Sequence, residues 1–176
     1  MNTLKKKNVL VIIPAYNEEK NIVKVVENLV HEYPQYDYVV INDGSKDSTS
    51  NICHDKGYQI IDLAVNLGLA GAFQTGLKYA YMKGYDHAIQ FDADGQHLAN
   101  YIESLYNKQK EGYDIVIGSR FTTKRKPKTF RMLGSSMISF AMRVTTGNKI
   151  TDPTSGMRMF NKKMIREFAL NLNYGP

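Results

Sequence analysis

The sequence predicts an α/β protein in which a mostly parallel sheet is covered by helices on both faces. Two observations lead to this fold class. Short apolar runs of strand length alternate with segments of helical periodicity, and residues 9–13 are apolar without interruption, as in a strand buried on both faces. Parallel strands joined by right-handed helical crossovers accommodate this alternation.

The first expected strand, 9–13, is followed by an amphipathic helix. Its apolar residues recur at i, i+3, i+4, i+7, i+8 and i+11: Ile22, Val25, Val26, Leu29, Val30 and Tyr33. We expect Asn17 to cap this helix, because its side chain can accept a hydrogen bond from the first free N–H groups. Glu18 and Glu19 then fall in the first turn, where the helix dipole favours acids, and Pro34 marks the end.

The alternation of strands and helices continues along the chain. Further strands are expected at residues 38–41, 59–63, 87–91 and 115–117. A short helix is expected between the second and third strands, from about Asp47 to Gly57. The next helix ends at Gly84 and carries the apolar stripe Leu69, Phe73, Leu77, Ala80 and Tyr81. The last ends at Gly112 and contains Ile102, Leu105 and Tyr106. No repeat or linker interrupts the pattern, so a single domain over residues 1–176 is predicted.

Composition narrows the class of protein. With 43% hydrophobic and 23% charged residues the chain is globular, which excludes a disordered, collagen-like or coiled-coil protein. The single cysteine, Cys53, leaves no intrachain disulfide and fits a reducing compartment. The longest apolar run, 9–13, is far shorter than the ~20 residues of a transmembrane helix and shorter than a signal-peptide core, so we expect a cytoplasmic protein.

The net charge of +6 is partly local. A basic run consists of Lys124, Arg125, Lys126, Lys128 and Arg131. Such a run is either a solvated loop or a surface for an anionic partner, which would be nucleic acid, a phosphorylated substrate or lipid. An apolar helical face overlaps the end of this run and either packs on the core or lies in a membrane interface; it consists of Phe130, Leu133, Met137, Phe140, Ala141 and Val144.

Polar residues follow four of the expected strands at the point where each strand ends. They lie at residues 14–18, 43–45, 92–94 and 119–120. Each could be an ordinary turn, but in an open parallel sheet the ligand binds beyond the carboxyl ends of the strands. The sequence therefore predicts a binding site at this edge.

Asp92 and Asp94 directly follow an apolar strand, with Gln96 close behind. A turn explains an isolated Asp-x-Asp sequence. Two carboxylates so close together repel each other unless a cation lies between them, and hard oxygen ligands suit Mg²⁺ or Mn²⁺. We therefore expect a divalent metal here, with open positions for substrate phosphates.

Asp43 lies in the sequence Asn-Asp-Gly-Ser, which needs no function beyond a turn. As a binding residue, its carboxylate can accept hydrogen bonds from a nucleobase imide or a ribose hydroxyl. Residues 14–17 place backbone groups and an aromatic ring after the neighbouring strand. Uracil and guanine both offer suitable N–H donors, so both remain open.

Taken together, the motifs resemble glycosyltransferases of family 2, which have the GT-A fold, a Rossmann-like, mostly parallel sheet. The matching segments are VIIPAYNEEKNI, VINDGSKDST, NLGLAGAFQTGLKYA, QFDADGQH, IVIGSRF and ITDPTSGMRMFN, in the order of the family and over nearly the whole chain. Within the family the chain looks most like bacterial relatives of dolichol-phosphate mannose synthase and other polyprenyl-phosphate glycosyltransferases. Relatives continue past Pro176 with a segment that this sequence lacks.

The resemblance implies a role for each matched position. The nucleotide pocket corresponds to Pro14, Ala15, Tyr16, Glu18 and Asp43. The metal and diphosphate site corresponds to Asp92, Asp94 and Gln96. The acceptor phosphate corresponds to Arg120 and Arg131, and the acidic position on the acceptor side of the reaction centre is Asp152. The implied catalytic residues are Asp92, Asp94 and Asp152.

The function implied is an inverting, metal-dependent transfer of a sugar from a UDP- or GDP-sugar to a polyprenyl phosphate at the cytoplasmic face of the cell membrane. One alternative acceptor is a saccharide hydroxyl in cell-surface polysaccharide synthesis, with Asp152 as general base. A nucleotidyltransferase is disfavoured because no glycine-rich phosphate loop follows the first strand. A nucleotide-sugar-binding module without turnover is the non-enzyme alternative. Nucleic acid is not an expected partner, and the oligomeric state stays open.

Overall fold

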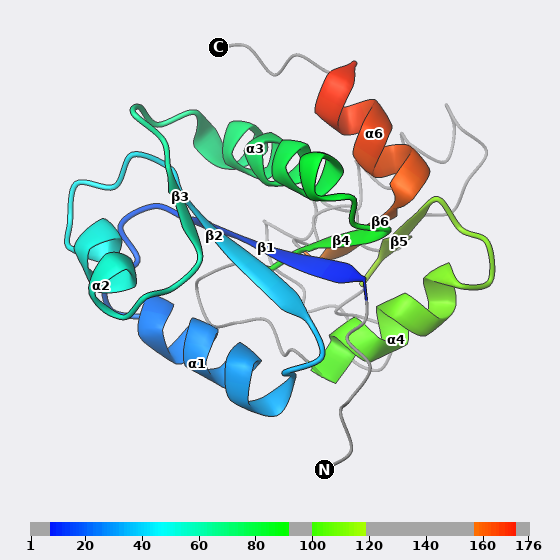
Figure 1. The fold of residues 1–176 in the computed structure, drawn as a ribbon, viewed down its shortest axis with the longest axis horizontal. Helices are drawn as coiled ribbons and strands as arrows, with labels where there is room; N and C mark the ends of the chain where they lie inside the picture. Colours follow the sequence, from blue (N-terminus) through cyan, green and yellow to red (C-terminus); the bar gives the residue numbers. More distant parts are fainter. Residues whose placement is uncertain (1–7, 92–99, 119–156, 172–176) are drawn as a thin grey trace, which may run out of the picture.

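The computed structural model of the chain describes residues 8–91, 100–118 and 157–171 (Figure 1). In this part of the chain one sheet has the strand order β3-β2-β1-β4-β6-β5. The strands are β1 (Val9–Ala15), β2 (Asp37–Asn42), β3 (Ile60–Asp62), β4 (His87–Gln90), β5 (Ile115–Ile117) and β6 (Arg158–Asn161). The first four pair in parallel, whereas β6 runs antiparallel to both β4 and β5. The predicted α/β class with a mostly parallel sheet is confirmed.

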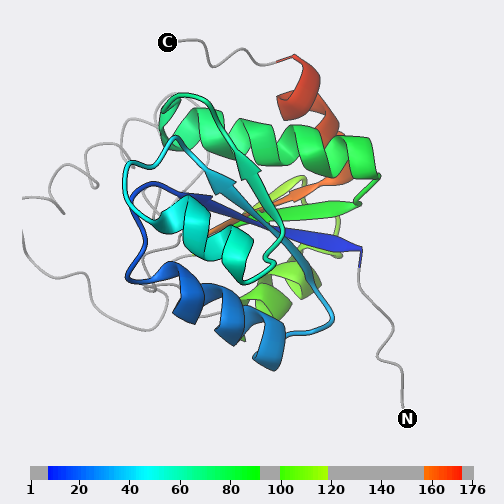
Figure 2. The same ribbon diagram turned by 60° about the vertical axis from the view of Figure 1, so that its left-hand side comes forward.

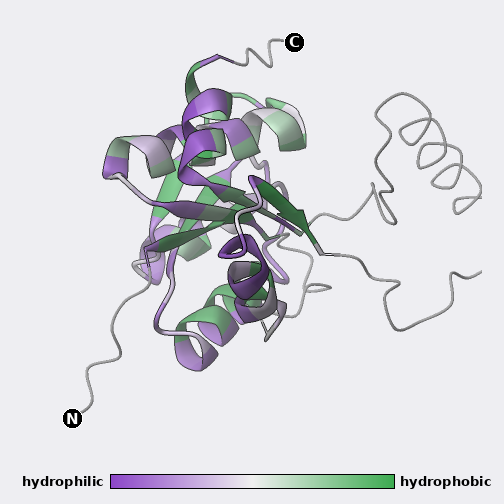
Figure 3. Ribbon diagram, turned by 90° about the vertical axis from the view of Figure 1, so that its right-hand side faces the viewer, coloured by the Kyte–Doolittle hydropathy of each residue, from purple (hydrophilic) through white to green (hydrophobic). Residues whose placement is uncertain are grey.

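Helices cover both faces of the sheet (Figures 1 and 2). One face carries α1 (Ile22–Glu32), α2 (Thr49–Asp55) and α4 (Asn100–Gln109), and the other carries α3 (Gly68–Lys83) and α6 (Lys162–Leu170). All seven residues of β1 are buried, because alternate side chains enter the two hydrophobic cores on either side. Figure 3 shows the apolar strands at the centre and the polar residues on the outward surfaces of the helices.

Helix α1 begins later than the sequence predicts. Its N-cap is Asn21 rather than Asn17, so the predicted cap is wrong. Asn17 instead adopts a left-handed conformation with φ 58°, and its side-chain oxygen accepts a hydrogen bond from the Lys46 amide at 2.8 Å. The predicted apolar face is buried at its first four positions, whereas Val30 is exposed. The polar turn after β1 therefore belongs to the edge of the sheet and not to the helix.

The buried face of α3 is made of smaller residues than the predicted stripe. Gly71, Ala72 and Gly76 are buried, whereas Leu69 and Tyr81, which the stripe included, are exposed. A Cβ atom at Gly76 would collide with the side chain of Ile12 on β1. Glycine is required there because the helix lies close against the sheet. The predicted stripe therefore included Leu77 and Ala80, which are buried, but missed the glycines of this face.

Strand β6 is absent from the sequence-based expectation. It is four residues long and includes Arg158 and Asn161, so it lacks a clear apolar run. Its inner residues, Met159 and Phe160, are buried between β4 and β5. The Asn161 side chain caps α6 by accepting a hydrogen bond from the Met164 amide at 3.0 Å. Across the described ranges, none of the helices is both long enough and apolar enough to span a bilayer.

Candidate functional site

The carboxyl ends of β1 and β2 bring two of the predicted segments together. Ala15 lies opposite Asn42 in the parallel register, and the Asp43 amide donates to the Ala15 carbonyl at 2.8 Å. Residues 14–18 and 43–46 therefore leave neighbouring strands at the same edge, as the sequence predicts for a parallel sheet.

Asp43 is a buried carboxylate held from one side. Asp43 is only 3% exposed, and its Oδ1 accepts a hydrogen bond from the Leu67 amide at 2.7 Å. No other residue in the described part of the chain donates to this carboxylate. Because an ionised carboxylate has about four acceptor positions, Asp43 can accept further hydrogen bonds beside the one from Leu67.

The loop of residues 65–67 packs directly on the turn that contains Asp43. Gly44 has φ 66°, and a Cβ atom on it would lie 2.8 Å from the Asn66 nitrogen. Only glycine combines this backbone conformation with so close an approach. The segment between β3 and α3 therefore forms one wall beside Asp43, a contribution that the strand-end pattern did not predict.

The turn after β1 is fastened to the turn after β2 by side-chain bonds. The Asn17 amide donates to Ser45 Oγ at 3.0 Å, and the Glu18 amide donates to Thr49 Oγ1 at 2.8 Å. Pro14 and Ala15 are buried, whereas Tyr16 presents its ring to solvent at 43% exposure. The Glu18 carboxylate accepts a hydrogen bond from Asn21 Nδ2 at 2.9 Å.

Asp47 fixes the start of α2 relative to α1. Its carboxylate accepts hydrogen bonds from the Glu19 amide at 3.1 Å and from the Thr49 amide at 3.0 Å. Partial burial opposes the charge, but the hydrogen bonds from Thr49 and Glu19 outweigh it and lower the pKa of Asp47. This carboxylate is therefore occupied in holding the two loops.

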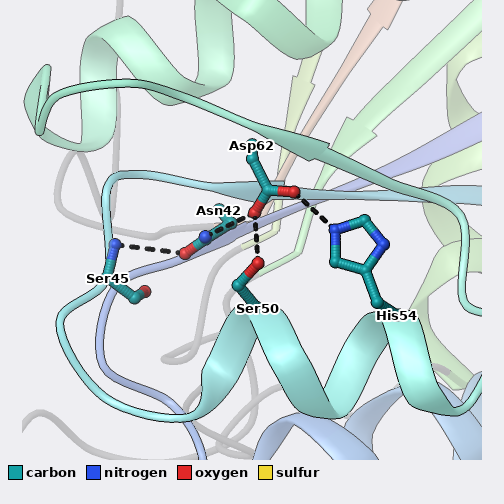
Figure 4. A network of polar contacts seen from close by, with 5 residues as sticks. All are labelled: Asn42, Ser45, Ser50, His54 and Asp62. Carbon is teal, nitrogen blue, oxygen red and sulfur yellow. Dashed lines mark hydrogen bonds and ion pairs between the residues drawn. The ribbon is translucent and has the colours of Figure 1, made fainter.

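A polar network, which we call the carboxyl-edge network, lies behind these loops (Figure 4); it consists of Asn42, Ser45, Ser50, His54 and Asp62. Asp62 Oδ1 accepts from Asn42 Nδ2 at 2.6 Å and from Ser50 Oγ at 2.7 Å. His54 Nε2 lies 2.7 Å from Asp62 Oδ2. Desolvation raises the pKa of Asp62, but hydrogen bonds from Asn42, Ser50 and His54 outweigh it, so the net pKa is lowered.

The sequence analysis missed Asp62, although a signal was present. Asp62 ends an apolar strand, as Asn42 does, and the two residues are partners in the parallel register. The expected third strand extended one residue too far, to Leu63, and so concealed Asp62 as a strand-end polar residue.

The ends of β4 and β5 lie at the same edge as those of β1 and β2. Gln90 and Ile117 both pair with Arg158 of β6. The Phe91 amide donates to the Ile12 carbonyl at 2.9 Å, and the Gly118 amide donates to the Met157 carbonyl at 2.9 Å. The residue before Asp92 and the residue before Ser119 thus both lie at the carboxyl edge of the sheet.

The remaining predicted site residues lie outside the described residues; they are Asp92, Asp94, Gln96, Arg120, Arg131 and Asp152. Within residues 8–91, 100–118 and 157–171, no three His, Cys, Asp or Glu side chains gather as a metal would need. The predicted metal and acceptor positions therefore stay predictions.

Comparison with known proteins identifies related sequences. The family model described as glycosyl transferase family 2 matches residues 10–168. The UDP-N-acetylglucosamine–dolichyl-phosphate N-acetylglucosaminyltransferase of Methanococcus voltae is 36% identical, over 94% of this chain and 74% of that protein. The polyprenol monophosphomannose synthase of Mycolicibacterium smegmatis is 29% identical, over 92% of this chain and 64% of that protein.

Similar solved structures share the fold at lower identity. Glucosyl-3-phosphoglycerate synthase from Mycobacterium tuberculosis, solved in complex with Mn²⁺ and UDP-glucose, superposes with a TM-score of 0.70 at 20% identity. The likeness covers 90% of this chain but 57% of that one, so the chain spans a little over half the length of this neighbour. The architecture of the sheet and helices is therefore that of a known fold.

Proposed function

Because the chain belongs to glycosyltransferase family 2 and has its GT-A fold, we propose that it transfers a sugar from a nucleotide-sugar donor to a polyprenyl phosphate. The observation that carries this acceptor class is the similarity to enzymes named for dolichyl-phosphate and polyprenol-phosphate acceptors, at 36% and 29% identity. Residues 1–176 act in this proposal as one catalytic domain, located at the cytoplasmic face of the membrane.

The donor nucleotide binds at the edge formed by β1 and β2. Asp43 has a buried carboxylate with one oxygen available to a ligand, and it suits an imide N–H of the base or a ribose hydroxyl. Pro14 and Ala15 end β1, Glu18 lies in the turn that follows, and the exposed Tyr16 is available to stack on the base. Both UDP- and GDP-sugars fit this description.

The diphosphate requires a counter-charge. Asp92, Asp94 and Gln96 offer hard oxygen ligands that would hold Mg²⁺ or Mn²⁺. The ion supplies Lewis-acid stabilisation of the charge that develops on the departing nucleoside diphosphate.

The acceptor is held by cationic side chains. Arg120 and Arg131 provide planar two-point contacts to phosphate oxygens. An oxygen of the acceptor phosphate attacks the anomeric carbon from the face opposite the leaving group, and the electron pair of the broken C–O bond leaves with the nucleoside diphosphate. The second pKa of a phosphate monoester is ~6, so the acceptor is mostly a dianion at neutral pH and needs no base.

A saccharide hydroxyl is the competing acceptor. A hydroxyl must lose its proton as it attacks, and Asp152 would take that proton. The variant Asp152→Asn separates the two acceptors. Loss of more than about a hundredfold in rate would indicate general-base catalysis, whereas a loss below about tenfold agrees with a phosphate acceptor.

A direct assay tests the proposed function. UDP- and GDP-sugars would be screened with undecaprenyl phosphate in detergent, and with oligosaccharide acceptors as the alternative, in Mg²⁺, Mn²⁺ or excess chelator. We expect a lipid-linked sugar monophosphate that forms only when a divalent ion is present. Sugar transfer to oligosaccharides alone would replace the proposed acceptor, and a protein that binds neither UDP nor GDP would overturn the donor site as well.

A further inference from the structure

The carboxyl-edge network contains a carboxylate that the proposed reaction does not use. Asp62 ends β3 and accepts hydrogen bonds from residues of two other elements, Asn42 of β2 and Ser50 and His54 of α2 (Figure 4). An ionised carboxylate only accepts hydrogen bonds, so His54 carries a proton on Nε2 in this contact. In the described part of the chain, the donors to Asp62 therefore come from the protein itself.

Asn42 links Asp62 to the turn beside Asp43. Asn42 is almost fully buried, at 4% exposure, and both ends of its side-chain amide are hydrogen-bonded. Nδ2 donates to Asp62 at 2.6 Å, and Oδ1 accepts from the Ser45 amide at 3.3 Å. Because the amide group is planar, the acceptor on one side determines where the oxygen on the other side points.

The connection continues to the other half of the candidate donor site. Ser45 Oγ accepts a hydrogen bond from the Asn17 amide at 3.0 Å, next to Tyr16 and Glu18. Asp43 lies between Asn42 and this turn, with its own amide bonded to Ala15. A single chain of contacts therefore runs from β3 through the turn after β2 to the turn after β1.

We propose that Asp62 is a positioning residue for donor binding, which acts through the Asn42 amide to hold the turn that carries Asp43. The inference rests on the proposed function, because it assigns Asp43 to the nucleotide. Asp62 makes no contact with the donor in this account.

The variant Asp62→Asn tests this role. It leaves one oxygen and puts an NH₂ group in place of the other, so the donors Asn42, Ser50 and His54 share a single, uncharged acceptor and the turn gains alternative conformations. The affinity of a site falls with the population of its competent conformation. We expect the Kd for UDP or GDP, whichever the wild-type protein binds in Mn²⁺, to rise about tenfold, since weakening a hydrogen bond to a charged group has a cost of that order.

Asp114→Asn is a matched control at the opposite edge of the sheet. Asp114 is also an aspartate bonded to a cross-strand asparagine, Asn161, at 2.8 Å, and to Lys163 at 2.8 Å. Both variants are expected to lower the unfolding temperature modestly, but only Asp62→Asn weakens nucleotide binding. Equal nucleotide affinity in the two variants would overturn the inference and leave Asp62 a purely structural residue.

A double-mutant cycle with Asn42→Ala tests the route. If Asp62 acts through Asn42, Asp62→Asn raises the Kd no further in the Asn42→Ala background. A full tenfold rise in that background would contradict this route. Wild-type protein that binds neither UDP nor GDP would overturn both proposals, whereas nucleotide binding that is insensitive to Asp62→Asn would overturn this one alone.

Discussion

Two polar networks of similar composition lie at opposite edges of the sheet. The carboxyl-edge network joins β2, β3 and α2 behind the candidate donor site. The second, which we call the amino-edge network, joins α4, β4, β6, α6 and the residue before β5, and consists of His87, Gln109, Asp114, Asn161 and Lys163. Each contains an aspartate, an asparagine and a histidine, so residue type alone does not distinguish them.

The difference lies in what the networks hold. In the amino-edge network Gln109 is buried, and its Nε2 donates to the carbonyls of Asp114 and Met159 at 3.3 and 3.2 Å. Gln109 thereby ties α4 to the start of β5 and to β6. The opposite ends of these two strands lie at the carboxyl edge of the sheet. The carboxyl-edge network instead ends at loop residues with polar groups available to a ligand. We propose that similar hydrogen bonds stabilise the fold at one edge and hold the turns of the candidate site at the other.

Replacing Gln109 should disrupt the amino-edge network and cause the largest loss of stability among the variants proposed here. Gln109→Ala removes the acceptor for His87 Nδ1, which lies 2.7 Å away. It also removes the side-chain donor to the buried Met159 carbonyl and one of the two donors to the Asp114 carbonyl, which keeps its bond from the Asn161 amide. We expect a loss of about 3 kcal/mol in the free energy of unfolding, with an unchanged Kd for the donor nucleotide. Urea unfolding and calorimetric titration measure the two quantities, and a weaker nucleotide affinity would show that the two edges are coupled.

Gly44 and Gly57 allow a matched test of the turns at the carboxyl edge of the sheet. Both have φ 66°, but a Cβ atom on Gly44 would meet the backbone of Val65 and Asn66 within 3 Å, whereas one on Gly57 would meet nothing within 4 Å. Gly57→Ala should cost about 1 kcal/mol for the left-handed conformation alone, and Gly44→Ala about 2 kcal/mol. Gly44→Ala should also weaken nucleotide binding, because it pushes residues 65–67 away from Asp43.

Equal losses of stability in the two glycine variants, measured by urea unfolding, would show that the loop yields freely and does not form a wall of the site. Gly57→Ala also serves as the control for nucleotide affinity, which it should leave unchanged.

Much of the fold follows from periodicity. A strand buried on both faces and an amphipathic helix are visible as apolar runs and stripes, and β1 and most of the α1 face were predicted correctly. The errors occur where packing and not apolarity decides. The α3 face depends on Gly76 approaching Ile12, and β6 is a strand only because Met159 and Phe160 fill the space between two strands.

Asp43 offers the most direct test of the site. Asp43→Asn keeps an oxygen for the Leu67 amide, which lies 2.7 Å from Oδ1, but removes the charge that a donor nucleotide would meet. We expect the Kd for the nucleotide to rise about twentyfold, as for a lost charge-assisted hydrogen bond of about 2 kcal/mol, with little change in unfolding temperature. Asp55→Asn, on the exposed side of α2, is the control and should change neither quantity. A similar rise in the control would point to the overall charge of the protein.

The part of the candidate site that lies at the ends of the strands was predictable from the sequence. Asp43 and residues 14–18 were found because parallel strands must deliver their ends to one edge. Asp62 and the Leu67 amide were not found, because their importance comes from cross-strand register and from a loop that folds back on Gly44. Such contacts depend on tertiary geometry that no local pattern contains.

The smallest expected effect is on the pH dependence of stability, and here the two edges should behave alike. Hydrogen bonds from Lys163 and Asn161 lower the pKa of Asp114. The pKa of Asp62 is also lowered, although desolvation opposes the shift, because hydrogen bonds from Asn42, Ser50 and His54 outweigh it. A carboxylate with a depressed pKa in the folded state stabilises the protein above its unfolded pKa, near 4, and this contribution is lost as the pH falls through the folded pKa.

Asp62→Asn and Asp114→Asn should therefore both lower the urea midpoint at pH 7, and both should converge on the wild type as the pH is lowered below about 4. Urea unfolding at a series of pH values measures this. A difference from the wild type that stays constant with pH would mean that packing, and not the charge, is what each aspartate contributes. If the charge acts similarly at both edges, nucleotide affinity is the measurement that separates the edge proposed to shape the donor site from the edge that holds the fold.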